Sequence, residues 1–323
     1  MYPYKALLFI LLLFSLDYSS VYSQNSSYRS EFGFISDNDA YLATGQDRYY
    51  TNGLFLNLRH AVSPARIRSD KVFKNIWEFN VAQQMYNPKS GYAPTQRYVD
   101  RPFAGYLFGS YARHWLFKNE NSIRAEIQIG TIGQHSLADK GQEFYHHAFG
   151  FYNIDGWQYQ IENEIGINTK VSYLLKLTES KNKKLDLSLP FSAHLGNYFS
   201  GLDMSALFRM GKINPLNNSV ATNSSIGNEG KYKGEFYFFL KPRLNWVAYN
   251  ATISGSMFNP KSDNEITFDS RPLVFAQEAG LAYAKERWNL GFSLTFKTKE
   301  IESSAKAHQY GSVRVAYKFG KNL

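Results

Sequence analysis

The chain contains no cysteine among its 323 residues. A secreted scaffold held by disulfides, a thiolate metal site and a thiol nucleophile are therefore excluded. Beyond its first residues the chain also lacks any run of about 18 apolar residues, which excludes membrane-spanning helices there. The Gly-x-Ser-x-Gly motif that carries the nucleophile of α/β-hydrolases is missing as well.

The N-terminus has the features of a secretory signal. One basic residue, Lys5, precedes a short apolar run from Ala6 to Leu16, and small residues then allow cleavage before Gln24. The apolar run is too short to span a membrane, which takes roughly 20 residues. We therefore expect residues 1–23 to be a signal peptide and residues 24–323 to form one exported domain.

Aromatic side chains are abundant, with 24 Tyr and 25 Phe, yet the mean hydropathy is only −0.40. A transmembrane β-barrel combines these two properties, because half of each strand faces a polar lumen. The formal net charge of +9 favours anionic partners such as lipid phosphates. No nucleic-acid-binding motif is present, and we expect no nucleic-acid partner.

Polar and apolar residues alternate with a period of two along most of the exported part. In residues 123–129, for example, Ile or Ala occupies each odd position and Arg, Glu or Gln each even one. This alternation predicts strands with one apolar and one polar face. A soluble β-sandwich alternates too. The length of the strands, the absence of a repeating blade motif and the export signal favour a barrel.

We therefore predict an all-β fold, an antiparallel transmembrane β-barrel of about 12 strands with a short helix in an extracellular loop. An even number of strands lets the barrel close with both termini on one side, which we take to be the periplasmic side. The connections 38–48, 87–103 and 134–157 are then extracellular. The polar stretch 211–233 is periplasmic, and the pattern does not explain its length. The strands are expected near residues 28–37, 49–62, 72–86, 104–116, 122–133, 158–177, 185–197, 200–212, 233–250, 272–285, 287–299 and 308–319.

Oxygen-bearing side chains gather at the end of the first predicted strand, in Asp37-Asn38-Asp39. Carboxylate, amide and carbonyl oxygens suit a hard cation such as Ca²⁺. A solvated turn rich in Asp and Asn is the alternative for such a triplet. Two roles also fit Thr51 at the start of the second strand: a donor to a developing oxyanion, or a β-branched strand residue.

A short helix is expected within residues 137–151, which have few strand signals and no proline. Gln142 and His146 are four residues apart and so share one face of this helix. Histidine is the side chain best suited to act as a general base near neutral pH. A single loop histidine is also commonly a plain surface residue, and His147 is a rival for the role of base.

These residues belong to motifs that occur together in one known family. The motifs are the Asn38-Asp39 pair, the Asp47…Tyr50-Thr51-x-Gly53 segment, the Asp100-Arg101 pair and the run Gln142…His146…Trp157-Gln158-x-Gln160-Ile161-Glu162-Asn163. Together they make the chain resemble the outer-membrane lipid A 3'-O-deacylase family. The resemblance covers nearly the whole mature chain in strand order, with the specific motifs in its first half.

The resemblance implies a carboxylic ester hydrolase of the bacterial outer membrane. Its substrate would be lipid A of lipopolysaccharide in the outer leaflet, from which it would remove the 3'-linked acyl chains. Its site would lie between the barrel wall and the loop helix, with Ca²⁺ as cofactor. A histidine would activate water, and the metal would stabilise the oxyanion.

The resemblance also assigns roles to individual residues. His146 would be the base, because it and not His147 keeps the family spacing to Trp157. Gln142 would support it from the same helical face. The metal and oxyanion site would be shaped by three further residues, Asn38, Asp39 and Thr51, of which Asn38 and Asp39 would hold the metal.

The chain departs from the family pattern in two places. Members carry an acidic residue shortly after the histidine, where this chain reads Phe149-Gly150-Phe151-Tyr152-Asn153, and Asp155 is the candidate replacement. The family also uses a basic residue in the second extracellular connection. Here Lys89, Arg97 and Arg101 are the candidates for substrate binding.

Two other functions fit the same sequence. The first is an esterase of the same mechanism that acts on phospholipid or on another acyl position. The second is a non-enzymatic barrel, such as a porin or a scaffold. A pore has no need of a helix that carries Gln142 and His146, which argues against the second. In each case we expect a membrane-embedded monomer.

Overall fold

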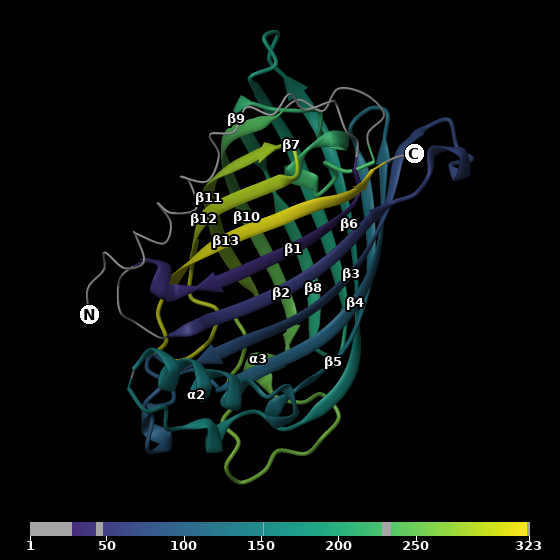
Figure 1. The fold of residues 1–323 in the computed structure, drawn as a ribbon. Helices are drawn as coiled ribbons and strands as arrows, with labels where there is room; N and C mark the ends of the chain where they lie inside the picture. The colour runs from purple at the N-terminus through teal and green to yellow at the C-terminus, as the bar shows by residue number, and fades with distance from the viewer. Residues whose placement is uncertain (1–27, 43–47, 151, 228–233, 322–323) are drawn as a thin grey trace.

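Thirteen strands in one sheet make up most of the part of the chain that the computed structural model describes, residues 28–42, 48–150, 152–227 and 234–321 (Figure 1). The predicted signal peptide lies outside the described residues, as does Asp47 of the second motif. The strands are β1 Tyr28–Asn38, β2 Tyr49–Ala61, β3 Val72–Asn87, β4 Ala104–Phe117, β5 Ser122–Ile132, β6 Glu164–Glu179, β7 Leu185–Gly196, β8 Phe199–Ser205, β9 Leu207–Lys212, β10 Glu235–Asn250, β11 Leu273–Lys285, β12 Trp288–Lys297 and β13 His308–Lys321.

The sheet is antiparallel and closed. β1 pairs with β13, with Phe32 opposite Tyr317. β8 and β9 both pair with β7 and with β10, so together they occupy one strand position of the barrel, which is interrupted at Ala206. The barrel therefore has twelve strand positions, which confirms the predicted number of strands. Among the described residues no helix is long and apolar enough to cross a membrane.

Two predicted strands differ from the structure. The strand expected at 158–177 begins only at Glu164, because the preceding residues bind loop backbone: Ile161 donates its N–H to the Phe103 carbonyl (3.0 Å). The strand expected at 200–212 breaks at Ala206. The Ala206 N–H donates to the Pro242 carbonyl (3.1 Å), but proline has no N–H, so the second hydrogen bond of this strand pair cannot form.

Two helices lie at the same end of the barrel, together with the connections that follow β1, β3 and β5 (Figure 1). α2, Ala138–Phe149, is the helix predicted within residues 137–151. α3, Ala251–Ser254, is a single turn that the sequence pattern did not predict. In the predicted topology this is the extracellular end, and the opposite end is periplasmic.

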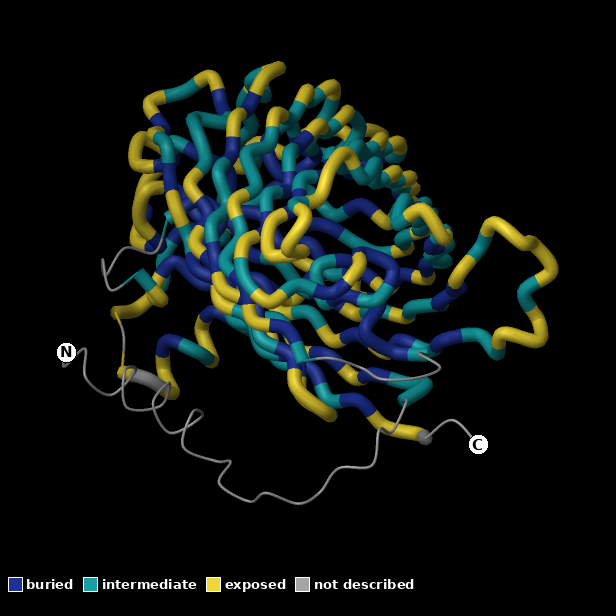
Figure 2. Tube along the Cα trace, turned by 90° about the horizontal axis from the view of Figure 1, so that it is seen from above, coloured by how far each residue is buried: buried dark blue, intermediate teal, exposed yellow. Residues whose placement is uncertain are grey.

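Along the middle of the strands, outward-pointing side chains are mostly apolar, and many inward-pointing ones are charged. Phe79 and Val81 of β3 are exposed on the outer face. Glu78 faces the lumen, where it pairs with Arg59 and with Arg124 (2.7 Å). Exposed and buried residues accordingly alternate along the strands in Figure 2. This is the arrangement that a barrel in contact with lipid needs.

The interior is filled at both ends. At the extracellular end an aromatic cluster occupies it, with Tyr50, Tyr86, Tyr106 and Tyr198 buried against Ala251 of α3. Tilted ring contacts join them in two pairs, with centroids 5.3 Å apart for Tyr50 and Tyr86 and 4.8 Å apart for Tyr106 and Tyr198. The aromatic cluster therefore fills the barrel interior at this end.

The long connection between β9 and β10 folds into the periplasmic end. Lys74 of β3 donates to Asn218 Oδ1 (2.6 Å) and to the Ser224 carbonyl (2.7 Å). Arg209 of β9 donates to Ser219 Oγ (2.7 Å). Residues 213–227 thus form a plug held by charged side chains of the wall, which accounts for most of the polar stretch 211–233. Residues 228–233 lie outside the described residues.

Candidate active site

The first three strands bring a row of side chains to the outer face of the barrel at its extracellular end. Phe34 and Leu54 are exposed on that face, and Asn38 and Asn52 share their parity. Asn38 lies opposite Asn52, and Asn52 lies opposite Met85 of β3. The outer surface is therefore polar at this corner, although farther along the same strands it is apolar.

A β-bulge at Thr51 sets up this row. The pairing of β2 with β3 shifts register between Tyr50 and Asn52. Tyr50 therefore stays inside the barrel, where it donates to Asp37 (2.8 Å), while Asn52 faces outward. Thr51 is buried, and its Oγ1 donates to Asp39 Oδ1 (3.4 Å). Strict alternation would have placed Tyr50 and Asn52 on one face, so sequence reasoning missed the bulge.

Backbone N–H groups hold Asn38 and Asp39. Asn38 Oδ1 accepts from the Ala40 N–H (2.7 Å), and Asp39 Oδ2 accepts from the Arg48 N–H (2.8 Å). The first of these is the bond of an Asx turn, one of the two alternatives that the sequence left open. Both side chains are buried, however, so the turn is not a solvated one. It presents the Asp39 carboxylate to the space between β1 and β2.

The side chains of this corner fit a hard cation. Asp39, Asn38, Asn52 and Thr51 each carry a side-chain oxygen, the kind of ligand that Ca²⁺ prefers. Asn52 Oδ1 is inaccessible to solvent and has no hydrogen-bond partner among the described residues. Leaving such an acceptor unpaired costs roughly 1–3 kcal/mol, which a bound cation would offset. Among the described residues, no three His, Asp or Glu side chains lie close enough together to hold a metal ion. A cation at this corner would therefore be bound by neutral oxygens and by one carboxylate, that of Asp39.

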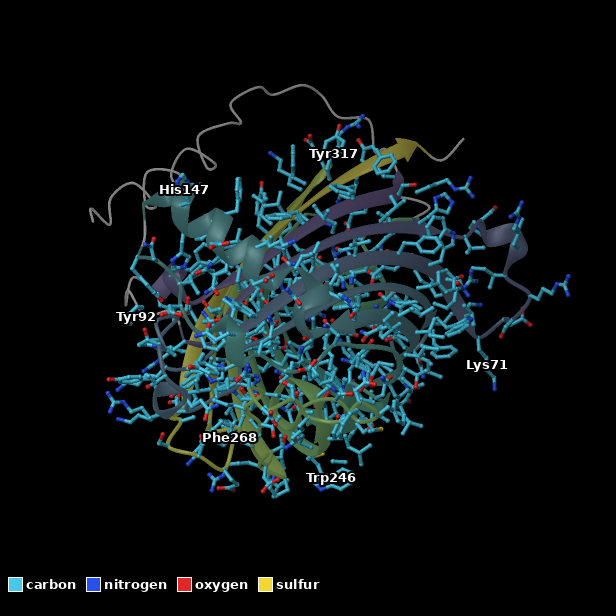
Figure 3. All side chains as sticks on the ribbon, turned by 90° about the horizontal axis from the view of Figure 1, so that it is seen from below. Lys71, Tyr92, His147, Trp246, Phe268 and Tyr317 are labelled. Atoms are coloured by element: carbon cyan, nitrogen blue, oxygen red, sulfur yellow. The ribbon has the colours of Figure 1, made fainter. Side chains whose placement is uncertain are left out.

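α2 carries the candidate base on its buried face. Gln142 and His146, one turn apart, are both buried, and Gln142 Oε1 accepts from Trp157 Nε1 (2.9 Å). This bond joins the helical part of the longest family motif to its second part, which begins at Trp157. His147 is exposed and lies on the outside of the molecule, at the end opposite to Lys71 (Figure 3). The two neighbouring histidines therefore have different surroundings.

A hydrogen bond fixes the tautomer of His146. Its Nδ1 lies 2.8 Å from the Tyr152 carbonyl oxygen, which can only accept, so Nδ1 carries the proton. In the neutral ring Nε2 then has the lone pair that can accept a proton. The Asp155 carboxylate, the candidate replacement for the family's acidic residue, accepts from Gln158 Nε2 instead (3.3 Å). Side-chain motifs missed the orienting group, because it is a backbone carbonyl.

α2 is seated on the outer face of β3. Gln83 donates Nε2 to the Ser136 carbonyl just before the helix (2.7 Å). Gly141 of the helix lies against Met85, and a Cβ at Gly141 would stand 2.8 Å from Met85 Cε. Met85 is also the register neighbour of Asn52. The helix and the polar row of β1 and β2 therefore flank the same side chain on the outside of the barrel.

The three cations predicted to bind substrate are in different surroundings. Lys89 and Arg97 are exposed on the connection after β3, and the Arg97 guanidinium lies over the Tyr98 ring (4.9 Å). Arg101 is only 1% exposed and donates to Thr252 Oγ1 of α3 (2.9 Å). Burial lowers the pKa of the Arg101 guanidinium. Lys89 and Arg97 are accessible to an anionic group from outside, whereas the geometry gives Arg101 a structural role.

Comparison with known proteins identifies the fold family. The family model described as outer membrane protein LpxR matches residues 7–319. The chain belongs to the LpxR family. This confirms the resemblance drawn from the motifs and places the LpxR-family barrel in the bacterial outer membrane. A search of curated proteins finds no match for the chain.

Three solved structures are similar to the chain to different degrees. LpxR from Salmonella typhimurium has a TM-score of 0.74 and 20% identity, over 90% of this chain and 100% of that one. The KdgM porin has a TM-score of 0.36 and 8% identity, over 90% of this chain and 99% of that one. The translocator domain of the autotransporter NalP from Neisseria meningitidis has a TM-score of 0.41 and 9% identity, over 98% and 95%. The first of these shares the fold of this LpxR-family chain.

Proposed function

We propose that this LpxR-family chain removes the 3'-linked acyl chains of lipid A by ester hydrolysis in the outer leaflet. The observation that carries the proposal is the bond from His146 Nδ1 to the Tyr152 carbonyl, which makes Nε2 the proton acceptor. The helix that bears this histidine is seated on the outer wall against Met85. A lipid in the membrane would reach such a site from the side, without entering the barrel.

The chemistry follows from the groups at hand. His146 Nε2 takes a proton from water as the water oxygen attacks the ester carbonyl carbon. Ca²⁺ held by Asn38 and Asp39, with Asn52 Oδ1 as a further oxygen, would supply charge stabilisation for the carbonyl oxygen. As the ester C–O bond breaks, the sugar oxygen takes the proton from the imidazolium. The products are a free fatty acid and a sugar hydroxyl, and the histidine returns to its neutral form.

The filled interior argues against a pore. A porin needs a water-filled channel from end to end. In this barrel the aromatic cluster around Tyr106 occupies one end, and the plug of residues 213–227 occupies the other. Exposed Lys89 and Arg97 on the connection after β3 are instead suited to the phosphates of a lipid at the membrane surface.

Mass spectrometry of lipid A tests the proposal. Cells that express the wild-type chain or His147→Ala should contain lipid A that has lost its 3' acyl chains, and cells that express His146→Asn should not. Loss of a different acyl chain, or of phospholipid acyl chains, would favour the other esterase. Unchanged lipids in cells with a correctly folded wild-type barrel would overturn the proposed hydrolysis.

A further inference from the structure

Phe144 of α2 is 77% exposed, more than any other large apolar side chain among the described residues. We infer that α2 is an interfacial anchor that places Phe144 among the acyl chains of the outer leaflet. The inference rests on the position of the barrel in the outer membrane. It does not depend on the proposed reaction.

The sequence of α2 gives the helix two different edges. Successive residues turn by about 100° around the axis. Gln142 and His146 mark the side buried against the wall. Measured from the midpoint of Gln142 and His146, Glu143 lies about 80° to one side, Ala148 lies about 140° to the other, and Phe144 lies on the face directly opposite. A helix laid along the barrel wall in this way has a polar edge toward water and an apolar edge toward lipid.

The start of α2 lies beside the lipid-facing surface of β3. Gln83, which binds the backbone just before α2, is two residues from Val81, a separation of about 7 Å along the strand. Val81 points outward and is 57% exposed. The helix therefore begins at the upper limit of the apolar belt, where barrels place aromatic side chains at the boundary between acyl chains and headgroups.

The anchor has a structural consequence for the face that carries His146. Gly141 packs on Met85 and leaves the helix close to the wall, with Phe144 three residues further along. Insertion of Phe144 would then hold the contact between α2 and the barrel wall at the depth where acyl chains meet headgroups. Burial of a phenylalanine side chain among acyl chains is favourable and opposes movement of the helix away from the wall.

The absence of cysteine makes the inference testable, because one introduced cysteine carries a unique nitroxide label. Phe144→Cys and Glu143→Cys would be labelled in the full-length barrel, folded into vesicles of phosphatidylethanolamine and phosphatidylglycerol. Collision of the label with oxygen, which concentrates in lipid, is compared with collision with a water-soluble nickel chelate. Val81→Cys calibrates the lipid-facing surface, and Lys71→Cys in the exposed turn at the other end calibrates water (Figure 3).

The label at position 144 should give an oxygen-to-nickel ratio close to that at Val81 and severalfold above that at Glu143. Ala148→Cys, on the same edge, repeats the measurement if the label at 144 perturbs folding. A ratio at 144 and 148 equal to that at Lys71 would overturn the anchor. The measurement involves no hydrolysis, so its outcome and that of the lipid A analysis are independent.

Discussion

Replacing His146 by asparagine would separate the catalytic role of this residue from its structural role. The asparagine Nδ2 takes roughly the place of the imidazole Nδ1 and can still donate to the Tyr152 carbonyl, now bound at 2.8 Å. Nothing in asparagine replaces Nε2 as a proton acceptor. We therefore expect activity to fall by roughly 10²–10⁴-fold, equivalent to about 3–5 kcal/mol of transition-state stabilisation, with little change in stability.

His146→Ala removes both functions of the side chain. It deprives the Tyr152 carbonyl of its donor, but Tyr152 is 43% exposed, so water can take the donor's place. The expected structural cost is therefore at the low end for a lost hydrogen bond, about 1 kcal/mol, and confined to α2. His147→Ala is the matched control, because its side chain is exposed.

Fatty-acid release from lipid A in detergent micelles measures the catalytic effect, and hydrogen exchange of the α2 amides measures the structural one. The wild-type rate should also fall on acidification, because a protonated imidazole cannot accept a proton. The assignment of the base would be refuted if His146→Asn kept more than about a tenth of the wild-type activity, well above the range for a lost base. Equal losses in His146→Asn and His147→Ala would refute it as well.

Chelation with EDTA should abolish hydrolysis and Ca²⁺ should restore it, with Asp39→Ala needing far more Ca²⁺; full activity in chelator would rule out the metal. By calorimetry, Asn52→Leu should weaken Ca²⁺ binding by about tenfold, the equivalent of roughly 1.4 kcal/mol. Asn245→Leu, a lumen asparagine whose Oδ1 is likewise inaccessible and unpartnered among the described residues, should not; equal effects would contradict a role for Asn52. At the other end, Arg209→Met leaves the buried Asp186 and Glu235 without their guanidinium and should destabilise the barrel by about 3–5 kcal/mol in denaturant unfolding. Arg314→Met removes a pair with a side chain 51% exposed and should cost less than about 1 kcal/mol, so equal midpoints would contradict the bracing role of the plug.

The sequence by itself determined the features that repeat locally. Lipid on one side and a polar lumen on the other impose a period of two on every strand. The number of strands around the barrel and most of their residue ranges could therefore be predicted. The helix was predictable because residues 137–151 have few strand signals and no proline, and helical geometry alone then places Gln142 and His146 on one face. The family motifs added the choice of His146 over His147 as the proposed base.

The tertiary structure alone decided the features that depend on partners distant in sequence. The bulge at Thr51 and the break at Ala206 arise from pairing with β3 and with Pro242, and neither leaves a local pattern. The proton position on His146 depends on a backbone carbonyl, which every residue has, so no residue type could announce it. The sequence of the plug is only a polar stretch without periodicity. Its place inside the barrel depends on hydrogen bonds from Lys74 and Arg209, which only the structure shows.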